Sequence, residues 1–249
     1  MSGHSKWHNI QAKKGKMDAA RGKIFTKIGR EIAIAVREGG SDPAINGKLR
    51  DVVAKAKANN MPNDNIMRSI KKAAGELDSV NYEEITYEGY APGGVAVIVE
   101  VITDNRNRAA SDIRHCFAKN GGNLGTTGSV NYMFDEKGLI VVERTPDSDE
   151  DEVMMMALDA GAADVEVSDD VAVIYTEPGD MSAVRTALEE QGCTFLSVER
   201  ALIAKNTVEV TDPEAVEKVR KIIDAFDDYD DTQNVFHNAI LPEEEEEDD

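Results

Sequence analysis

The sequence has few cysteines and no long apolar segment, and each shortage excludes a class of protein. Cys116 and Cys193 are the only cysteines among 249 residues, too few for a disulfide framework or a CxxC-type metal site. The longest uninterrupted apolar run, Val153 to Leu158, has six residues, whereas a membrane-spanning helix needs roughly 20. The opening residues are polar and lack the apolar stretch of a secretory signal. We therefore expect a cytoplasmic protein that does not associate with membranes.

Familiar catalytic and nucleotide-binding motifs are missing as well. The GxxxxGK[ST] phosphate loop, the GxSxG elbow and the HExxH zinc helix do not occur. The glycine-rich segment at 121–128 lacks a following lysine, so we interpret it as a loop at a sheet edge. His115 and Cys116 are adjacent on a predicted helix, where neighbours point about 100° apart and cannot meet. The acidic residues from Asp228 onward lack the glycine and glutamate of a calcium loop. These absences predict neither an enzyme nor a cofactor or metal site.

Charge is distributed unevenly along the chain. The net charge is −20, yet residues 1–76 contain 16 lysines and arginines against 7 aspartates and glutamates. Between Lys6 and Arg30 there are eight basic residues and a single acid, Asp18. Because the Debye length at physiological salt is about 8 Å, the distant acidic residues are largely screened from this segment. The amino-terminal part can therefore attract a polyanion although the whole protein is acidic.

Residues 1–78 predict a basic helical domain. From Gly22 to Glu38 an apolar residue recurs every four positions, which is typical of an amphipathic helix. Two shorter helices are predicted, one starting near Asn46 and one from about Pro62 to Gly75. None of the three can bury its apolar stripe alone, so they must pack as a small bundle. Residues 2–21 show no clear period and are candidates for ordering on a partner.

After Asp78 the pattern changes to strands alternating with helices. Strands are predicted at 82–90, 95–103 and 129–134, with one helix between the second and third that buries Ala109, Ile113 and Phe117. From Gly138 the order is strand, helix, strand, strand, helix, strand, over 138–144, 149–160, 163–168, 171–177, 180–191 and 194–203. This β-α-β-β-α-β order is ferredoxin-like. A strand at 207–211, a helix at 213–226 and a strand at 232–237 then complete the earlier group.

The predicted fold class is therefore α+β, with an N-terminal three-helix domain followed by two ferredoxin-like α/β domains, one inserted in the other. The predicted boundaries are 1–78 for the helical domain, 79–134 plus 206–240 for the discontinuous domain, 135–205 for the inserted domain and 241–249 for an acidic disordered tail.

Several long segments are similar to the YebC/PmpR family. They are GHSKWHNIQAKKGKMDAARGKIFTKIGREI near the start, NNMPNDNIMRSIKKAAGE at 59–76, YEGYAPGGVAVIVEVITDNRNRAASDIRHCFAKNGGNLG from Tyr87, and DDTQNVFHN at 230–238. The resemblance covers essentially the whole chain apart from the residues after Pro242. It implies three domains and a non-enzymatic role. Family members are described as DNA-binding regulators of transcription, or as ribosome-associated factors that assist translation of proline runs.

The resemblance also marks candidate nucleic-acid-binding residues. The family's basic positions carry over onto Lys6, Lys13, Lys14, Arg21, Lys23, Lys27 and Arg30. Lys16 adds a charge outside the family pattern, and Trp7, the single tryptophan, is a candidate for base stacking. A solvated helical face remains the alternative for the charges, and packing on the bundle the alternative for Trp7. The predicted partner is DNA, or alternatively ribosomal RNA, and the sequence does not predict an oligomeric state.

Overall fold

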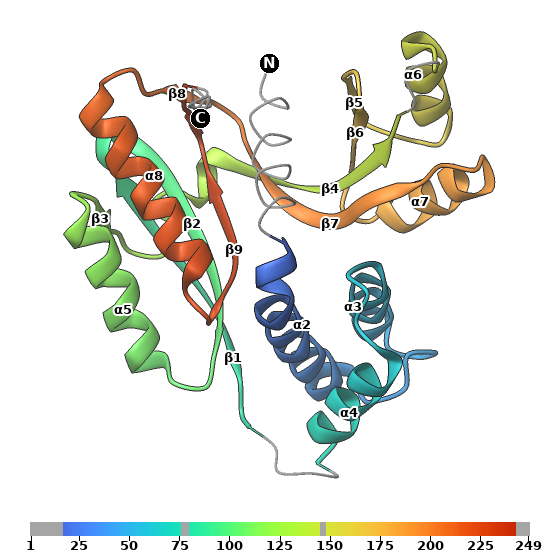
Figure 1. Ribbon diagram of the computed structural model, residues 1–249, viewed down its shortest axis with the longest axis horizontal. Helices are drawn as coiled ribbons and strands as arrows, with labels where there is room; N and C mark the ends of the chain where they lie inside the picture. Colours follow the sequence, from blue (N-terminus) through green and yellow to red (C-terminus); the bar gives the residue numbers. More distant parts are fainter. Residues whose placement is uncertain (1–16, 76–79, 145–147, 243–249) are drawn as a thin grey trace. The chain divides into compact units, whose positions relative to one another are not determined.

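The computed structural model describes residues 17–75, 80–144 and 148–242 (Figure 1). By their internal contacts these residues form two units, one over 134–205 and one that contains the remaining segments. The second unit therefore holds the helical bundle together with the first β-sheet. The finer division into three domains and a tail stays a prediction. No helix in the described segments is long and apolar enough to cross a membrane.

The bundle consists of α2 (Met17–Gly39), α3 (Gly47–Ala58) and α4 (Asn63–Ala73). Its core contains Ile28, Ile32, Leu49, Ile66 and Ile70, which carry the helical spacing seen in the sequence. The buried Asn46 fixes the entry to α3. Its side-chain oxygen accepts a hydrogen bond from the Leu49 amide at 3.0 Å, and its amide nitrogen donates to the Ala35 carbonyl at 2.8 Å. One side chain thus caps α3 and ties it to the end of α2.

The first sheet has the strand order β3-β1-β2-β9, with every neighbouring pair antiparallel. The strands are β1 (Glu83–Ala91), β2 (Val95–Thr103), β3 (Asn123–Leu124) and β9 (Thr232–His237), and the 3-10 turn η1 (Pro92–Gly94) joins β1 to β2. Helices α5 (Arg106–Lys119) and α8 (Pro213–Asp228) lie side by side on one face (Figure 1). The rings of Phe117 and Phe226 meet edge-on between them, with centroids 4.8 Å apart. Alternate residues of β2, including Val97 and Val99, complete this core.

The 134–205 unit is ferredoxin-like, as its element order predicts. It runs through β4 (Phe134–Glu143), α6 (Glu150–Asp159), β5 (Asp164–Val167), β6 (Val171–Thr176), α7 (Met181–Glu190) and β7 (Phe195–Ala204). The strand order is β5-β6-β4-β7, and all neighbours are antiparallel. The helices bury Val153, Ala157, Val184 and Leu188 against the sheet. The predicted α+β class, with N-terminal helices followed by sheet domains, is confirmed.

Three predicted segments differ in the structure. Residues 129–134 are not a separate strand, because η2 (Asn131–Met133) leads directly into β4 and the edge strand β3 lies earlier. The predicted strand at 207–211 is reduced to β8 (Val208–Glu209), which pairs in parallel with β10 (Ala239–Ile240). Of the predicted tail, Leu241 packs against the first core and 243–249 lie outside the described residues.

The glycine-rich segment at 121–128 is shaped by packing. Gly121 has φ of 77°, which allows the chain to leave α5 in the left-handed conformation. A Cβ atom on Gly122 would lie only 2.7 Å from the carbonyl oxygen of Tyr90. The glycines therefore let β3 approach β1 closely at the sheet edge, as the interpretation of this segment expected.

A buried carboxylate organises the residues that follow. Glu88 on β1 is 4% exposed, and its carboxylate accepts hydrogen bonds from the amides of Gly128, Val130 and Asn131 at 2.6 to 2.8 Å. Burial alone would raise the pKa of Glu88, but the three amides stabilise the ionised form and hold the pKa below its ordinary value. The turn before β4 therefore depends on this charge rather than on strand pairing.

We predict that Glu88→Gln destabilises the fold by about 1–3 kcal/mol near neutral pH, because its amide nitrogen cannot accept a backbone N–H. The lowered pKa makes the wild-type contribution complete above about pH 4.3, the ordinary glutamate value, and lost as the pH falls through the folded-state pKa. Urea unfolding at neutral and acid pH checks both points, with the exposed Glu83→Gln as control. A gap between wild type and Glu88→Gln that widens in acid would contradict this account.

Candidate nucleic-acid interface

The basic side of α2 faces the turn that joins α8 to β9. Lys23 Nζ lies 3.3 Å from Asp228 Oδ1, and Lys27 Nζ donates to the Asp227 carbonyl oxygen at 3.4 Å. One turn further along, Arg30 Nη1 lies 2.9 Å from Asp231 Oδ1. Three of the predicted nucleic-acid contacts are therefore engaged by the protein itself.

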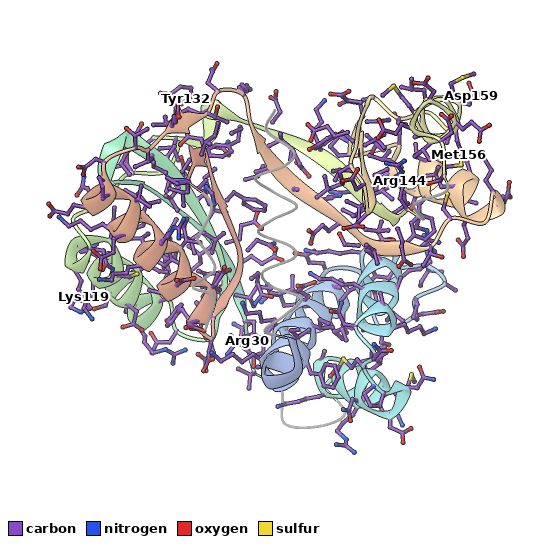
Figure 2. The ribbon with its side chains drawn as sticks, turned by 45° about the horizontal axis from the view of Figure 1, so that its top comes forward. Arg30, Lys119, Tyr132, Arg144, Met156 and Asp159 are labelled. Carbon is purple, nitrogen blue, oxygen red and sulfur yellow. The ribbon has the colours of Figure 1, made fainter. Side chains whose placement is uncertain are left out.

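The Arg30–Asp231 pair is the buried member of this set. Figure 2 labels Arg30, on α2. The Arg30 side chain is 14% exposed and that of Asp231 only 5%. The guanidinium group also donates to the Asp230 carbonyl oxygen and lies over the Tyr82 ring, 5.8 Å from its centroid. These contacts use the charge, the planar donors and the flat face of arginine together. Lysine cannot reproduce all three.

Asp231 gathers groups from four elements. Besides Arg30, its carboxylate accepts hydrogen bonds from Arg108 Nη2 at 2.9 Å, Thr103 Oγ1 at 2.8 Å and the Tyr229 hydroxyl at 3.3 Å. Burial would raise the pKa of Asp231, but the hydrogen bonds from Arg108 and Thr103 hold it below the usual aspartate range. The hydrogen bond to Asp231 in turn raises the pKa of Arg108. The carboxylate therefore stays ionised and links α2 to β2, α5 and the end of α8.

The ion pairs that Lys23 and Arg30 form differ in whether a phosphate can displace the carboxylate. The side chains of Lys23 and Asp228 are 50% and 81% exposed, and such surface pairs contribute about 0–1 kcal/mol. A phosphate can replace Asp228 as the partner of Lys23 at small cost. Removing Arg30 would leave the buried Asp231 with Arg108, Thr103 and Tyr229 as its remaining donors, and the loss of one hydrogen bond to a charged group costs about 1.5–3 kcal/mol. We therefore assign Arg30 a structural role and regard Lys23 as exchangeable.

Most of the other predicted contacts cannot be placed. Lys6, Trp7, Lys13, Lys14 and Lys16 lie outside the described residues. Arg21 lies in α2, but the first side chain that the structure describes is that of Lys23. Their role in nucleic-acid binding stays a prediction.

The outer face of α4 carries cations that the sequence analysis did not single out. Arg68, Lys71 and Lys72 fall within about 100° around the helix axis, opposite the buried Ile66 and Ile70. All three are exposed, and none makes a side-chain hydrogen bond or ion pair with any residue from 17–75, 80–144 or 148–242. The only acid in the helix is Asp64, in its first turn. A helical projection of the sequence would have shown this face.

The lysines of α3 differ in whether they form ion pairs. Lys48 and Lys55 form ion pairs with Glu38 and Glu31, at 3.0 and 2.8 Å. Lys57, near the end of α3, is exposed and has no such pair in the described segments. Arg37 and Arg50 donate to amide and carbonyl oxygens but form no ion pair with a described carboxylate. The cations of α4 lack even such neutral acceptors among the described residues. The three cations of α4, Arg68, Lys71 and Lys72, are called the α4 face below.

A groove lies between α5 and α8. It has a volume of about 570 Å³ and is lined by residues that include His115, Cys116, Lys119, Lys221 and Tyr229. Burial raises the pKa of the Cys116 thiol to about 11, so the thiol is neutral at physiological pH and a poor nucleophile. No group of three or more metal-ligating side chains occurs in the described part of the chain. The groove thus shows no catalytic constellation.

Known proteins match along nearly the whole chain. Residues 5–76 match the family model described as TACO1/YebC protein N-terminal domain, and residues 82–239 match that of the TACO1/YebC second and third domain. A Clostridium tetani protein is 60% identical over 98% of this chain and 99% of its own length, and one from Acetivibrio thermocellus is 59% identical over 96% and 98%. Both are named "Probable transcriptional regulatory protein".

A solved structure agrees with the fold. The crystal structure of a conserved hypothetical protein from Aquifex aeolicus superposes with a TM-score of 0.84 at 45% sequence identity. The superposition covers 92% of this chain and 94% of that one.

We predict that the Lys23–Asp228 and Arg30–Asp231 ion pairs differ in their contribution to stability. Arg30→Met should lower the free energy of unfolding by about 1.5–3 kcal/mol, because the buried Asp231 loses one of its two ion pairs and keeps the other with Arg108. Lys23→Met, which removes an exposed pair on the same helix, should cost less than about 1 kcal/mol. Urea denaturation followed by circular dichroism measures both. Equal losses for the two variants would show that Arg30 is no more structural than Lys23.

Proposed function

Because the chain belongs to the TACO1/YebC family, we propose that it is a non-enzymatic, DNA-binding transcriptional regulator that holds nucleic acid through its basic helical bundle. The names of the two bacterial relatives support regulation of transcription. We further propose that it acts in the cytoplasm, where a bacterial regulator meets its DNA.

The observation that carries this proposal is the α4 face. Its cations are exposed and unpaired within the described residues, whereas most basic side chains elsewhere in those residues are opposite a carboxylate. Free ammonium and guanidinium groups bind phosphates by releasing condensed counterions, and this release supplies most of non-specific affinity. An acidic protein that keeps such a face uncompensated has a local site for a polyanion.

The α2 cations differ in whether they can contact a phosphate in the proposed complex. Lys23 can exchange Asp228 for a phosphate, while Arg30 keeps its place beside Asp231. Lys- and Arg-rich contacts of this kind position a protein on the backbone without identifying the sequence. We therefore expect the residues before α2, with Trp7 as a stacking candidate, to extend the contact made by the α4 face.

We predict that the triple variant Arg68→Gln, Lys71→Gln and Lys72→Gln binds mixed-sequence duplex DNA about tenfold or more weakly at moderate salt. The slope of log affinity against log salt should become shallower by roughly 2.7, or about 0.9 for each lost phosphate contact. Fluorescence anisotropy over a salt series measures both quantities. The matched control replaces Arg185, Arg200 and Lys205 of the 134–205 unit by glutamine, which removes the same charge.

Two results would contradict the proposal. One is an equal loss of DNA affinity in the α4 and control variants, because net charge rather than the α4 face would then govern binding. The other is failure of the wild-type protein to bind duplex DNA under salt conditions in which it co-sediments with ribosomes. That result would move the function to ribosomal RNA and translation.

A further inference from the structure

Helix α6 exposes large apolar side chains on the side away from its own core. Met154, Met155 and Leu158 are 39%, 65% and 48% exposed. At about 100° per residue the three lie within roughly 100° of one another around the helix axis. Val153 and Ala157 lie on the other side and are buried against the sheet. The three exposed residues, called the α6 patch below, therefore form one continuous apolar surface rather than scattered exposed side chains.

The helix that carries the patch is firmly placed. The Arg144 side chain is only 6% exposed, forms an ion pair with Glu150 at 3.6 Å and donates to the Ser148 carbonyl oxygen at 2.7 Å (Figure 2). It also donates to the Ser168 carbonyl oxygen in the turn between β5 and β6. The Met156 side chain points to the core, with its sulfur 3.8 Å from that of Cys193. A partner would thus meet a preformed surface, which reduces the entropy lost on binding.

Carboxylates surround the patch, and no base lies on the helix. The first turn of α6 contains Glu150, Asp151 and Glu152, and the last residue of the helix is Asp159. The sequence over 134–205 contains 18 aspartates and glutamates against five lysines and arginines. Phosphate polymers and anionic membranes are repelled by such a surface, and a second copy presenting the same face is repelled as well.

We propose that the α6 patch is a docking surface for a cationic amphipathic helix of a partner protein. Such a helix places apolar side chains at i, i+3, i+4 and i+7 against a groove or face, with basic residues at its borders. Methionine side chains are flexible and polarisable and adapt to such anchors. The acidic residues at both ends of α6 attract the basic border and set its orientation.

The proposal is independent of nucleic-acid binding, because it rests on a different element of opposite charge. A chain that holds a polyanion at the α4 face and a cationic protein segment at the α6 patch acts as an adaptor between the two.

The experiment uses the full-length chain and two fluorescent helical peptides. One peptide is composed of leucine and lysine with an amphipathic period, and the other has glutamate in place of every lysine. We expect saturable binding of the lysine peptide, weakened about tenfold by Met154→Gln, Met155→Gln and Leu158→Gln together, and no binding of the glutamate peptide. The control variant replaces the exposed Ile45, Val80 and Tyr132 by glutamine, and thermal unfolding confirms that both variants fold.

Three outcomes would overturn the proposal. Unchanged affinity in the α6 variant would show that the peptide is held by charge alone. An equal loss in the control variant would show that any exposed apolar residue suffices. Self-association of the wild-type chain that disappears in the α6 variant would assign the patch to a second copy of the chain.

Discussion

The buried carboxylate of Asp231 is the interaction on which the larger unit depends. It joins Arg30 of α2, Thr103 of β2, Arg108 of α5 and Tyr229 at the end of α8. A charged side chain that is only 5% exposed is tolerated because Arg30, Arg108, Thr103 and Tyr229 all donate to its carboxylate. The helical bundle is therefore attached to the sheet through an ion pair that cannot be broken cheaply, and the residues around it are held in place for structural reasons.

This attachment changes the interpretation of the basic residues of α2 as nucleic-acid contacts. Lys23, Lys27 and Arg30 look like a row of phosphate contacts, yet the turn at 227–231 already supplies oxygens to each of them. The α4 face, which lacks such partners among the described residues, then becomes the stronger candidate for nucleic acid. A run of basic residues in the sequence therefore does not show which of their side chains are free to bind a phosphate.

Much of the fold was predictable, because apolar spacing alone decides it. The stripe of α2, the hairpin of β1 and β2, and the β-α-β-β-α-β order of the 134–205 unit are local patterns. The turn before β4 was not, since Glu88 on a distant strand holds its amides. The partners of Arg30 were equally hidden, because Asp231 lies about 200 residues away in sequence. Exposure on α4 and α6 was calculable from helical angles, but only the structure separates a free cation from a paired one.

Hydrogen–deuterium exchange of the full-length protein with and without duplex DNA tests the central claim most directly. If the Arg30–Asp231 ion pair persists in the complex and DNA binds at the α4 face, DNA should slow exchange in peptides covering 63–73. Exchange in peptides covering 226–232 should stay unchanged. Faster exchange at 226–232 on adding DNA, with no protection of α4, would show that nucleic acid displaces the carboxylate, and the account would be wrong.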